Sequence, residues 1–83
     1  MPYRVELKPS VRKELKQLPG TVYDRVIACI LSLAENPRPY GVKKLTGEDA
    51  YRVRVGDHRI IYEIHDDVLL VYVVRIRHRR EAY

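Results

Sequence analysis

The chain has 83 residues, of which 46% are hydrophobic and 33% are charged, and its formal net charge at pH 7 is +5. This length predicts one domain over residues 1–83 and excludes two separate cores, while the composition excludes wholesale disorder. A compact domain with such a positive excess is typical of proteins that meet an anionic partner, nucleic acid above all.

Cys29 is the single cysteine, so no internal disulfide forms and a reducing compartment fits the chain. Its place in an apolar stretch predicts a role in core packing rather than as a nucleophile. No apolar run approaches the roughly 18 residues of a membrane span, and the N-terminal residues lack the apolar segment of a signal peptide. We therefore expect a cytoplasmic protein without a membrane partner.

The first half of the chain predicts one strand and two helices. Residues 3–8 alternate apolar and polar side chains, as a half-buried strand does. Residues 11–18 carry apolar side chains at helical spacing. A longer apolar stripe over residues 22–34 predicts a second helix, and Thr21 with Asp24 resembles a capping box at its start. The short connection predicts an antiparallel helical hairpin.

The second half of the chain predicts a loop followed by three strands. Residues 37–49 are a loop by composition, and from residue 50 the periodicity becomes two. The strands cover residues 50–55, 58–64 and 67–77, and Gly56-Asp57 is a hairpin signal between the first two. The order β-α-α-β-β-β predicts an α+β fold, with the helical hairpin packed on one face of a mainly antiparallel four-stranded sheet.

The hairpin turn predicts a cluster of arginines on one sheet face. If Gly56 and Asp57 form the turn, Arg54 lies opposite Arg59, and Arg52 shares their face. Like charges directly opposite one another destabilise a sheet by up to about 1 kcal/mol. The last strand adds three arginines of one parity: Arg75, Arg77 and Arg79. Whether these join the first cluster depends on the turn at residues 65–68, because a bulge at that turn would reverse their parity.

Two interpretations of these charges are open, solvation of an exposed sheet face and phosphate binding. Lysine is the usual solvating cation, whereas no lysine follows Lys44. The planar guanidinium of arginine suits bidentate contact with phosphate. The pattern favours nucleic acid as the ligand over a phosphorylated small molecule, because the chain has no glycine-rich phosphate loop.

Few residues near the arginines could transfer a proton. His78 stands among Arg77, Arg79 and Arg80, and both a catalytic and a structural role stay open for it. Tyr83 could stack on a base or transfer a proton. The histidines, the lone cysteine and the carboxylates do not show ligand spacing, so we expect neither a metal site nor a cofactor.

Three stretches together resemble the RelE/ParE superfamily of bacterial and archaeal toxins. They are KKLTG (43–47), YRVRVGDHRIIYEI (51–64) and VVRIRHRREAY (73–83). The resemblance covers essentially the whole chain and implies the RelE-like, microbial RNase-like fold. The spacing from the last arginines to Tyr83 is more similar to the RelE branch, whose members cut mRNA in the ribosomal A site, than to the ParE branch, whose members inhibit DNA gyrase.

The resemblance implies roles for single positions. Arg52 and Arg54 match strand cations that contact and polarise the scissile region, and Arg59 matches an arginine that holds the phosphate. Arg79 matches a cation that stabilises the leaving 5′-oxygen or acts as the acid, and Tyr83 matches a tyrosine that stacks on the substrate and takes part in proton transfer. Further expected RNA contacts are Lys43, Lys44, Arg75, Arg77 and Arg80.

The chain departs from the family pattern in ways that bear on mechanism. Well-known members carry lysines at Arg52 and Arg54, and an arginine cannot serve as a general base. The base role therefore passes to Tyr83 or His78. The chain also ends at Tyr83, without the C-terminal helix of some relatives. The expected silencing partner is an acidic, RelB-like antitoxin in a hetero-oligomer, and the other partners are the ribosome and mRNA.

Three functional hypotheses follow for this chain. The first is a ribosome-dependent, metal-independent endoribonuclease that cleaves mRNA and inhibits translation. The second is a gyrase-inhibiting toxin of the ParE type. The third is a basic RNA-binding module without catalysis.

Overall fold

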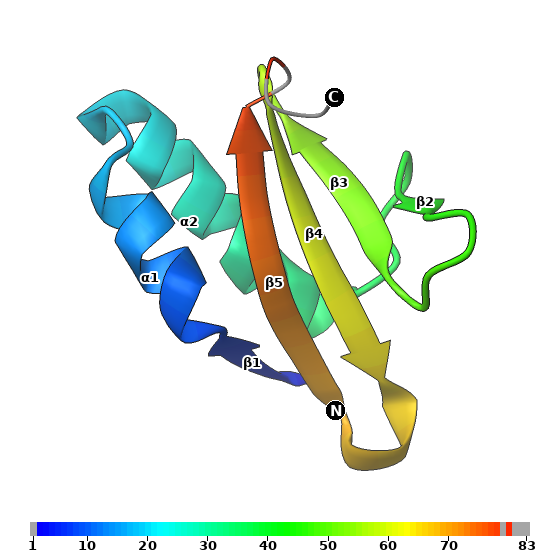
Figure 1. Ribbon diagram of the computed structural model, residues 1–83. Coiled ribbons are helices and arrows are strands. Elements are labelled where there is room, and N and C mark those ends of the chain that lie inside the picture. Colours follow the sequence, from blue (N-terminus) through cyan, green and yellow to red (C-terminus); the bar gives the residue numbers. More distant parts are fainter. Residues whose placement is uncertain (1, 79, 81–83) are drawn as a thin grey trace.

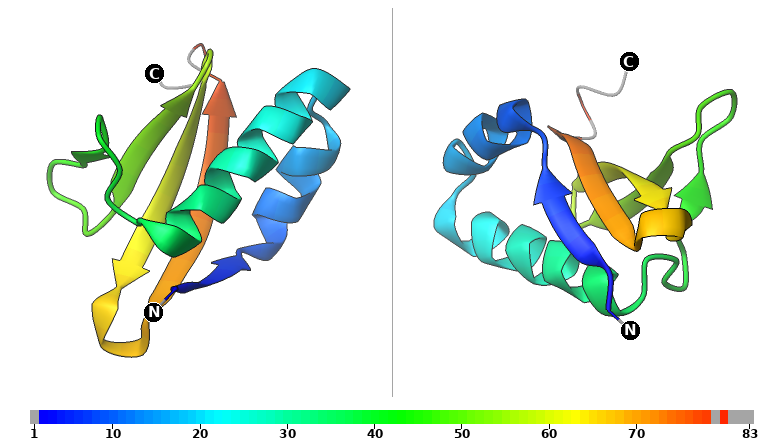
Figure 2. Two further views of the ribbon diagram at one scale, coloured as in Figure 1. Left: turned by 180° about the vertical axis from the view of Figure 1, so that it is seen from behind. Right: turned by 90° about the horizontal axis from the view of Figure 1, so that it is seen from below.

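A computed structural model describes residues 2–78 and Arg80 (Figure 1). In chain order the elements are β1 (Arg4–Leu7), α1 (Pro9–Lys16), α2 (Gly20–Glu35), β2 (Lys43–Lys44), β3 (Tyr51–Val55), β4 (His58–His65), the 3₁₀ turn η1 (Asp66–Val68) and β5 (Leu70–His78). The sheet order is β1-β5-β4-β3-β2. Both helices pack on one face of this sheet and leave the other face uncovered (Figure 2). The predicted α+β arrangement is confirmed.

The sheet has five strands among the described residues, where the sequence predicted four. The additional strand is β2, which pairs antiparallel with β3 through only two residues inside the predicted loop. Two residues are too few to show an alternating pattern, so composition alone hid this strand. β1 pairs with β5 in parallel, and the other neighbouring strands pair antiparallel.

The β3–β4 hairpin has the predicted register. Val55 lies opposite His58, and Arg54 lies opposite Arg59. Gly56 has a positive φ of 58°, which a glycine adopts readily at the first central position of a two-residue hairpin turn. The turn type therefore determines which side chains of β3 and β4 share a face.

The helices bury the stripes that their spacing predicts. Val11 and Leu15 of α1 are buried, and so are Val26, Ile30 and Leu33 of α2. The predicted capping box at Thr21 and Asp24 is wrong. α2 begins at Gly20, with Pro19 at the N-cap and no side-chain cap, and the Tyr23 N–H donates to the Pro19 carbonyl at 2.8 Å.

The core lies between the helical hairpin and β4–β5, and Tyr62 is its largest fully buried side chain. Its hydroxyl donates to the Pro37 carbonyl at 2.7 Å, and burial raises the pKa of this phenol. Cys29 is half-buried and packs against the core, where burial raises the pKa of its thiol. The predicted packing role of Cys29 is thereby confirmed. Neither helix of the described chain is long and apolar enough to cross a membrane.

A polar cluster around Asp66 joins the N-terminus, the loop after α2 and the turn before β5. The Arg38 guanidinium donates to both carboxylate oxygens of Asp66, at 3.2 and 2.8 Å, and the Tyr3 hydroxyl donates to the same carboxylate. The hydrogen bonds from Arg38 and then Tyr3 lower the pKa of Asp66 from 3.8 to about 2. Arg38 also lies 5.4 Å from the ring centroid of Tyr51.

Replacing Asp66 by Asn should lower stability at neutral pH and change its acid dependence. Because the folded-state pKa lies below the unfolded value, the Asp66 contribution is complete above about pH 4 and is lost as the pH falls towards 2. Urea unfolding of both proteins between pH 7 and pH 2 should give curves that converge at the acid end. Curves separated by a constant amount over this range would contradict the assignment.

Candidate nucleic-acid interface

The uncovered sheet face carries five arginines, Arg52, Arg54, Arg59, Arg75 and Arg77, which we call the arginine face. Arg54, Arg59 and Arg77 lie directly opposite one another across β3, β4 and β5. The neighbouring row contains Lys43, Arg52, Ile61 and Arg75 across four strands. Guanidinium groups from three strands therefore share one side of the sheet.

A β-bulge in β5 aligns the last strand with this face. Arg75 lies opposite Ile61, but Tyr62 lies opposite Val73, so Val74 is the extra residue. Val71 and Val73 are fully buried on the helix side, and Ile76 is buried as well. Because side chains alternate, an unbulged strand would give Arg75 and Arg77 the parity of Val73 and turn them towards the core. The extra residue Val74 therefore places Arg75 and Arg77 on the same face as Arg59.

Two glutamates lie at the border of the arginine face. Glu48, in the loop before β3, is 4.0 Å from an Arg75 guanidinium nitrogen. Glu14 of α1 is 3.8 Å from Arg77 and also accepts the backbone N–H of Ile76 at 3.3 Å. These ion pairs are partly exposed, so they contribute little to stability. Because Arg75 and Arg77 stay partly exposed in these pairs, a phosphate can compete with the glutamates for the two guanidinium groups.

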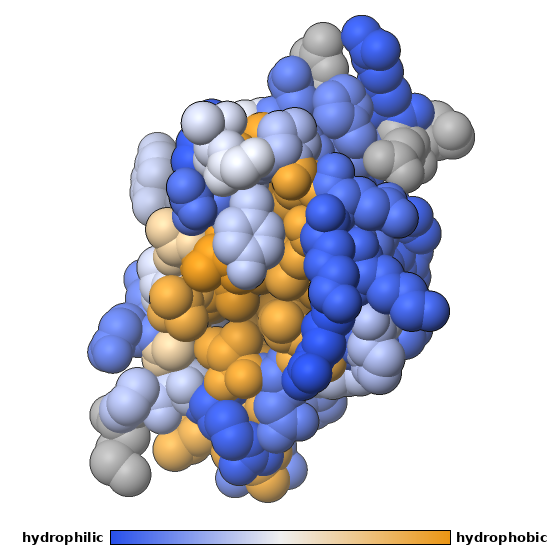
Figure 3. Space-filling view, turned by 90° about the vertical axis from the view of Figure 1, so that its left-hand side faces the viewer, coloured by the Kyte–Doolittle hydropathy of each residue, from blue (hydrophilic) through white to orange (hydrophobic). Residues whose placement is uncertain are grey.

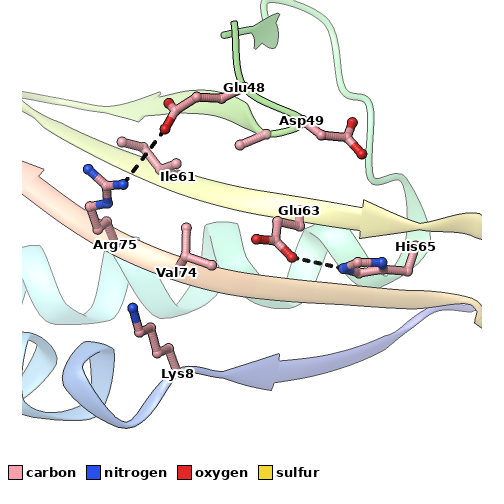
Figure 4. A pocket seen from close by; sticks show the side chains of 9 residues that line it. Lys8, Glu48, Asp49, Ile61, Glu63, His65, Val74 and Arg75 are labelled. Atoms are coloured by element: carbon pink, nitrogen blue, oxygen red, sulfur yellow. Dashed lines mark hydrogen bonds and ion pairs between the residues drawn. The ribbon is translucent and has the colours of Figure 1, made fainter.

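A hollow of about 530 Å³ opens at the end of the arginine face next to Arg75 (Figure 4). Its lining mixes both charges, because Lys8 and Arg75 meet Glu48, Asp49 and Glu63. His65 lies 2.9 Å from Glu63 across a nitrogen–oxygen contact. Sequence reasoning missed Glu63 and His65 as members of this face, although both have the parity of Arg59 on β4.

The structure separates His78 from the arginine face. His78 lies opposite His58, the two rings meet edge to face with centroids 5.0 Å apart, and the Nδ1 atom of His78 accepts the Arg80 N–H at 3.2 Å. Both histidines line a hollow with Leu18 and Pro19 at the helix side of the sheet. Adjacent residues of a strand point to opposite faces, so His78 and Arg77 face different environments.

The remaining predicted site residues are either exposed or outside the residues that the structure describes. Lys43 and Lys44 form β2, where both are exposed and Lys43 pairs with Arg52. Arg80 is exposed. Arg79 and Tyr83 lie outside the described residues. Within the described part of the chain, no group of three or more His, Cys, Asp or Glu side chains is arranged to hold a metal ion.

Comparisons with known proteins agree with this architecture. The family described as ParE toxin of type II toxin-antitoxin system, parDE, matches residues 5–83. Toxin RelG of Mycobacterium tuberculosis is 31% identical over 86 residues, covering 100% of this chain and 98% of RelG. The mRNA interferase toxin RelE of Escherichia coli K12 is 25% identical over 87 residues, covering 100% of this chain and 92% of that protein.

The solved structure of the archaeal RelE–RelB complex from Pyrococcus horikoshii OT3 contains a chain similar to this one. The TM-score is 0.87 at 33% identity, with 99% of this chain and 100% of that chain covered. Fold and sequence together define a toxin of the type II toxin–antitoxin class. The chain belongs to the RelE/ParE superfamily, and its relatives and structural neighbours place it in the RelE branch.

The repulsion between the opposed arginines should lower the free energy of unfolding. Replacing exposed Arg54 by Gln removes repulsion with Arg59 and should raise the unfolding free energy by about 0.5 kcal/mol at low salt. Urea unfolding measures this gain, which should shrink at about 0.5 M salt because the repulsion is screened. The matched control is Arg12→Gln, at an exposed position of α1, which should give no gain. An Arg54→Gln protein no more stable than this control would contradict the proposed repulsion.

Proposed function

We propose that the protein is a ribosome-dependent, metal-independent endoribonuclease that cleaves mRNA in the ribosomal A site. The row of Arg54, Arg59 and Arg77 across three strands carries this proposal, because it concentrates positive charge where a phosphodiester can lie. The similarity to a relative named mRNA interferase toxin RelE supports the same activity. A toxin of this kind would act in the cytoplasm, where translating ribosomes are found.

The reaction requires attack of a ribose 2′-oxygen on the adjacent phosphorus and departure of the 5′-oxygen. The 2′-hydroxyl loses a proton, the 5′-oxygen gains one, and the products carry a 2′,3′-cyclic phosphate and a 5′-hydroxyl. Arg59 would hold the phosphate between Arg54 and Arg77, and their charge would stabilise the additional negative charge of the transition state. Arg52 would orient the same strand from the neighbouring row.

Proton transfer must come from groups other than these arginines, because a guanidinium does not give up its proton in proteins. The proposal assigns this role to Tyr83, with Arg79 stabilising the leaving 5′-oxygen. His78 is the weaker candidate, since it lies beside His58 at the helix side of the sheet. The ribosome would supply the remaining requirement, which is the alignment of the 2′-hydroxyl with the scissile bond.

The helical side of the protein offers a surface for the antitoxin. Tyr23, Ile27 and Leu31 of α2 recur at intervals of four residues, and the side chain of Leu31 is 62% exposed. Figure 3 views this side, where apolar surface lies between hydrophilic flanks. An amphipathic, acidic segment of a RelB-like antitoxin would bury this stripe and complement the net charge of +5. The solved relative in complex with RelB supports such a hetero-oligomer.

Cleavage of mRNA on programmed ribosomes tests the proposed function. Primer extension should show cuts at a fixed position within the A-site codon, and a single 2′-deoxynucleotide at the attacking position should abolish them. Arg59→Ala should slow cleavage about a hundredfold or more, as expected for loss of a group that stabilises transition-state charge. Arg12→Ala on α1 is the control and should cleave at the wild-type rate.

The result also separates the competing functions. Intact mRNA together with inhibited DNA supercoiling would favour a gyrase-directed toxin, which the ParE description of the matching family makes the second candidate. Binding of RNA or antitoxin without either activity would leave a non-catalytic module. If Arg59→Ala cleaves mRNA at the wild-type rate, the proposed role of the arginine face in catalysis is contradicted.

A further inference from the structure

Tyr40 is the most exposed large hydrophobic side chain of the described residues, with a relative exposure of 106%. It lies in the loop between α2 and β2, which stands beside the outer edge of the sheet (Figure 1). A single exposed aromatic residue is ordinary by itself. Tyr40 differs from an isolated surface aromatic residue in its backbone turn and in its cationic neighbours.

The backbone holds Tyr40 at the tip of a tight turn. The Val42 N–H donates to the Pro39 carbonyl at 3.1 Å, and Gly41 has a φ of +89°. A hydrogen bond from the fourth residue to the first, with a positive φ at the third, is the pattern of a type II turn. Tyr40 occupies the second position, so its ring projects from a short, defined turn.

Tyr40 lines a hollow together with residues of the arginine face. This hollow of about 290 Å³ is lined by Tyr40, Gly41, Lys43, Arg52, Val53 and Arg54. Arg52 and Arg54 belong to the arginine face, and Lys43 lies opposite Arg52 on β2. An exposed tyrosine and three cations thus line one hollow at the same edge of the sheet.

We infer that Tyr40 is a stacking platform for one unpaired RNA base at the edge of the arginine face. Lys43 and Arg52 would hold the flanking phosphates, next to the scissile phosphate at Arg54, while the ring takes the base. This combination of an aromatic side chain with a cationic groove is the general means of binding single-stranded nucleic acid. The inference rests on the proposed function, and it adds a subsite outside the reacting centre.

Two variants distinguish the contribution of the Tyr40 ring from that of its hydroxyl. Tyr40→Ala should raise the KM of ribosome-dependent cleavage about five- to 150-fold, the range expected for loss of one stacked base. The kcat should change less than about twofold, because the Tyr40 subsite lies outside the reacting centre. Tyr40→Phe keeps the ring and should behave like the wild type. Thermal unfolding should be unchanged in both, since the side chain is fully exposed.

A binding arm identifies which RNA supplies the base. The probe is a fluorescent, single-stranded 2′-O-methyl RNA oligonucleotide, which cannot be cleaved by 2′-hydroxyl attack, followed by anisotropy. Weaker binding by Tyr40→Ala than by Tyr40→Phe supports stacking on mRNA. Unchanged oligonucleotide binding with weaker binding to vacant ribosomes supports stacking on ribosomal RNA. Val68→Ala, at an exposed position in η1, is the control in both arms.

The inference is overturned if active wild-type protein and Tyr40→Ala have the same KM and the same binding in both arms. It is also overturned if Tyr40→Phe is as impaired as Tyr40→Ala, because the hydroxyl would then be the functional group. Absence of cleavage by the wild type is a different result, which contradicts the proposed function. In that case the oligonucleotide arm still tests the stacking platform directly.

Discussion

One extra residue in β5 determines where the positive charge of this protein lies. Val74 has no partner on β4, so the strand changes parity between Val73 and Arg75. Before the bulge the odd-numbered residues enter the core, and after it Arg75 and Arg77 face outward. An apolar strand can therefore continue into a run of cations without burying a guanidinium, which would cost several kcal/mol. The three-strand row of arginines depends on this irregularity.

The arginine face opposes stability, and the other side of the sheet compensates for it. Arg54, Arg59 and Arg77 repel one another across adjacent strands, whereas a sheet selected for stability alone would place opposite charges there. The helical hairpin provides the opposing contribution through a continuous apolar core around Tyr62. Glu14 and Glu48 pair with Arg77 and Arg75 at the border of the cluster. This clustering of like charges is expected for the polyanion-binding surface that the proposed function requires.

Sequence reasoning predicted the hairpin register correctly, because Gly56-Asp57 is a local turn signal that specifies the pairing of its flanking strands. It could not locate the bulge, since Val74 looks like any other valine in an apolar run and its effect depends on the partner strand. The same lack of local signal hid β2, with its two residues. Glu63 and His65 did have a signal, because they share the parity of Arg59 on β4, and sequence reasoning overlooked it. The capping box at Thr21 failed because the N-cap of α2 lies two residues earlier, at Pro19. The roles of Arg79 and Tyr83 remain predictions.

Cross-strand disulfide trapping tests the position of the bulge most directly. In a Cys29→Ala background, Arg59→Cys combined with Arg77→Cys places two thiols directly opposite each other on one face, and mild oxidation should give an intramolecular disulfide detectable by mass spectrometry. In a strand without the bulge, Arg59 would instead lie opposite Ile76. Efficient trapping of Arg59→Cys with Ile76→Cys, and none with Arg77→Cys, would therefore contradict the shared arginine face.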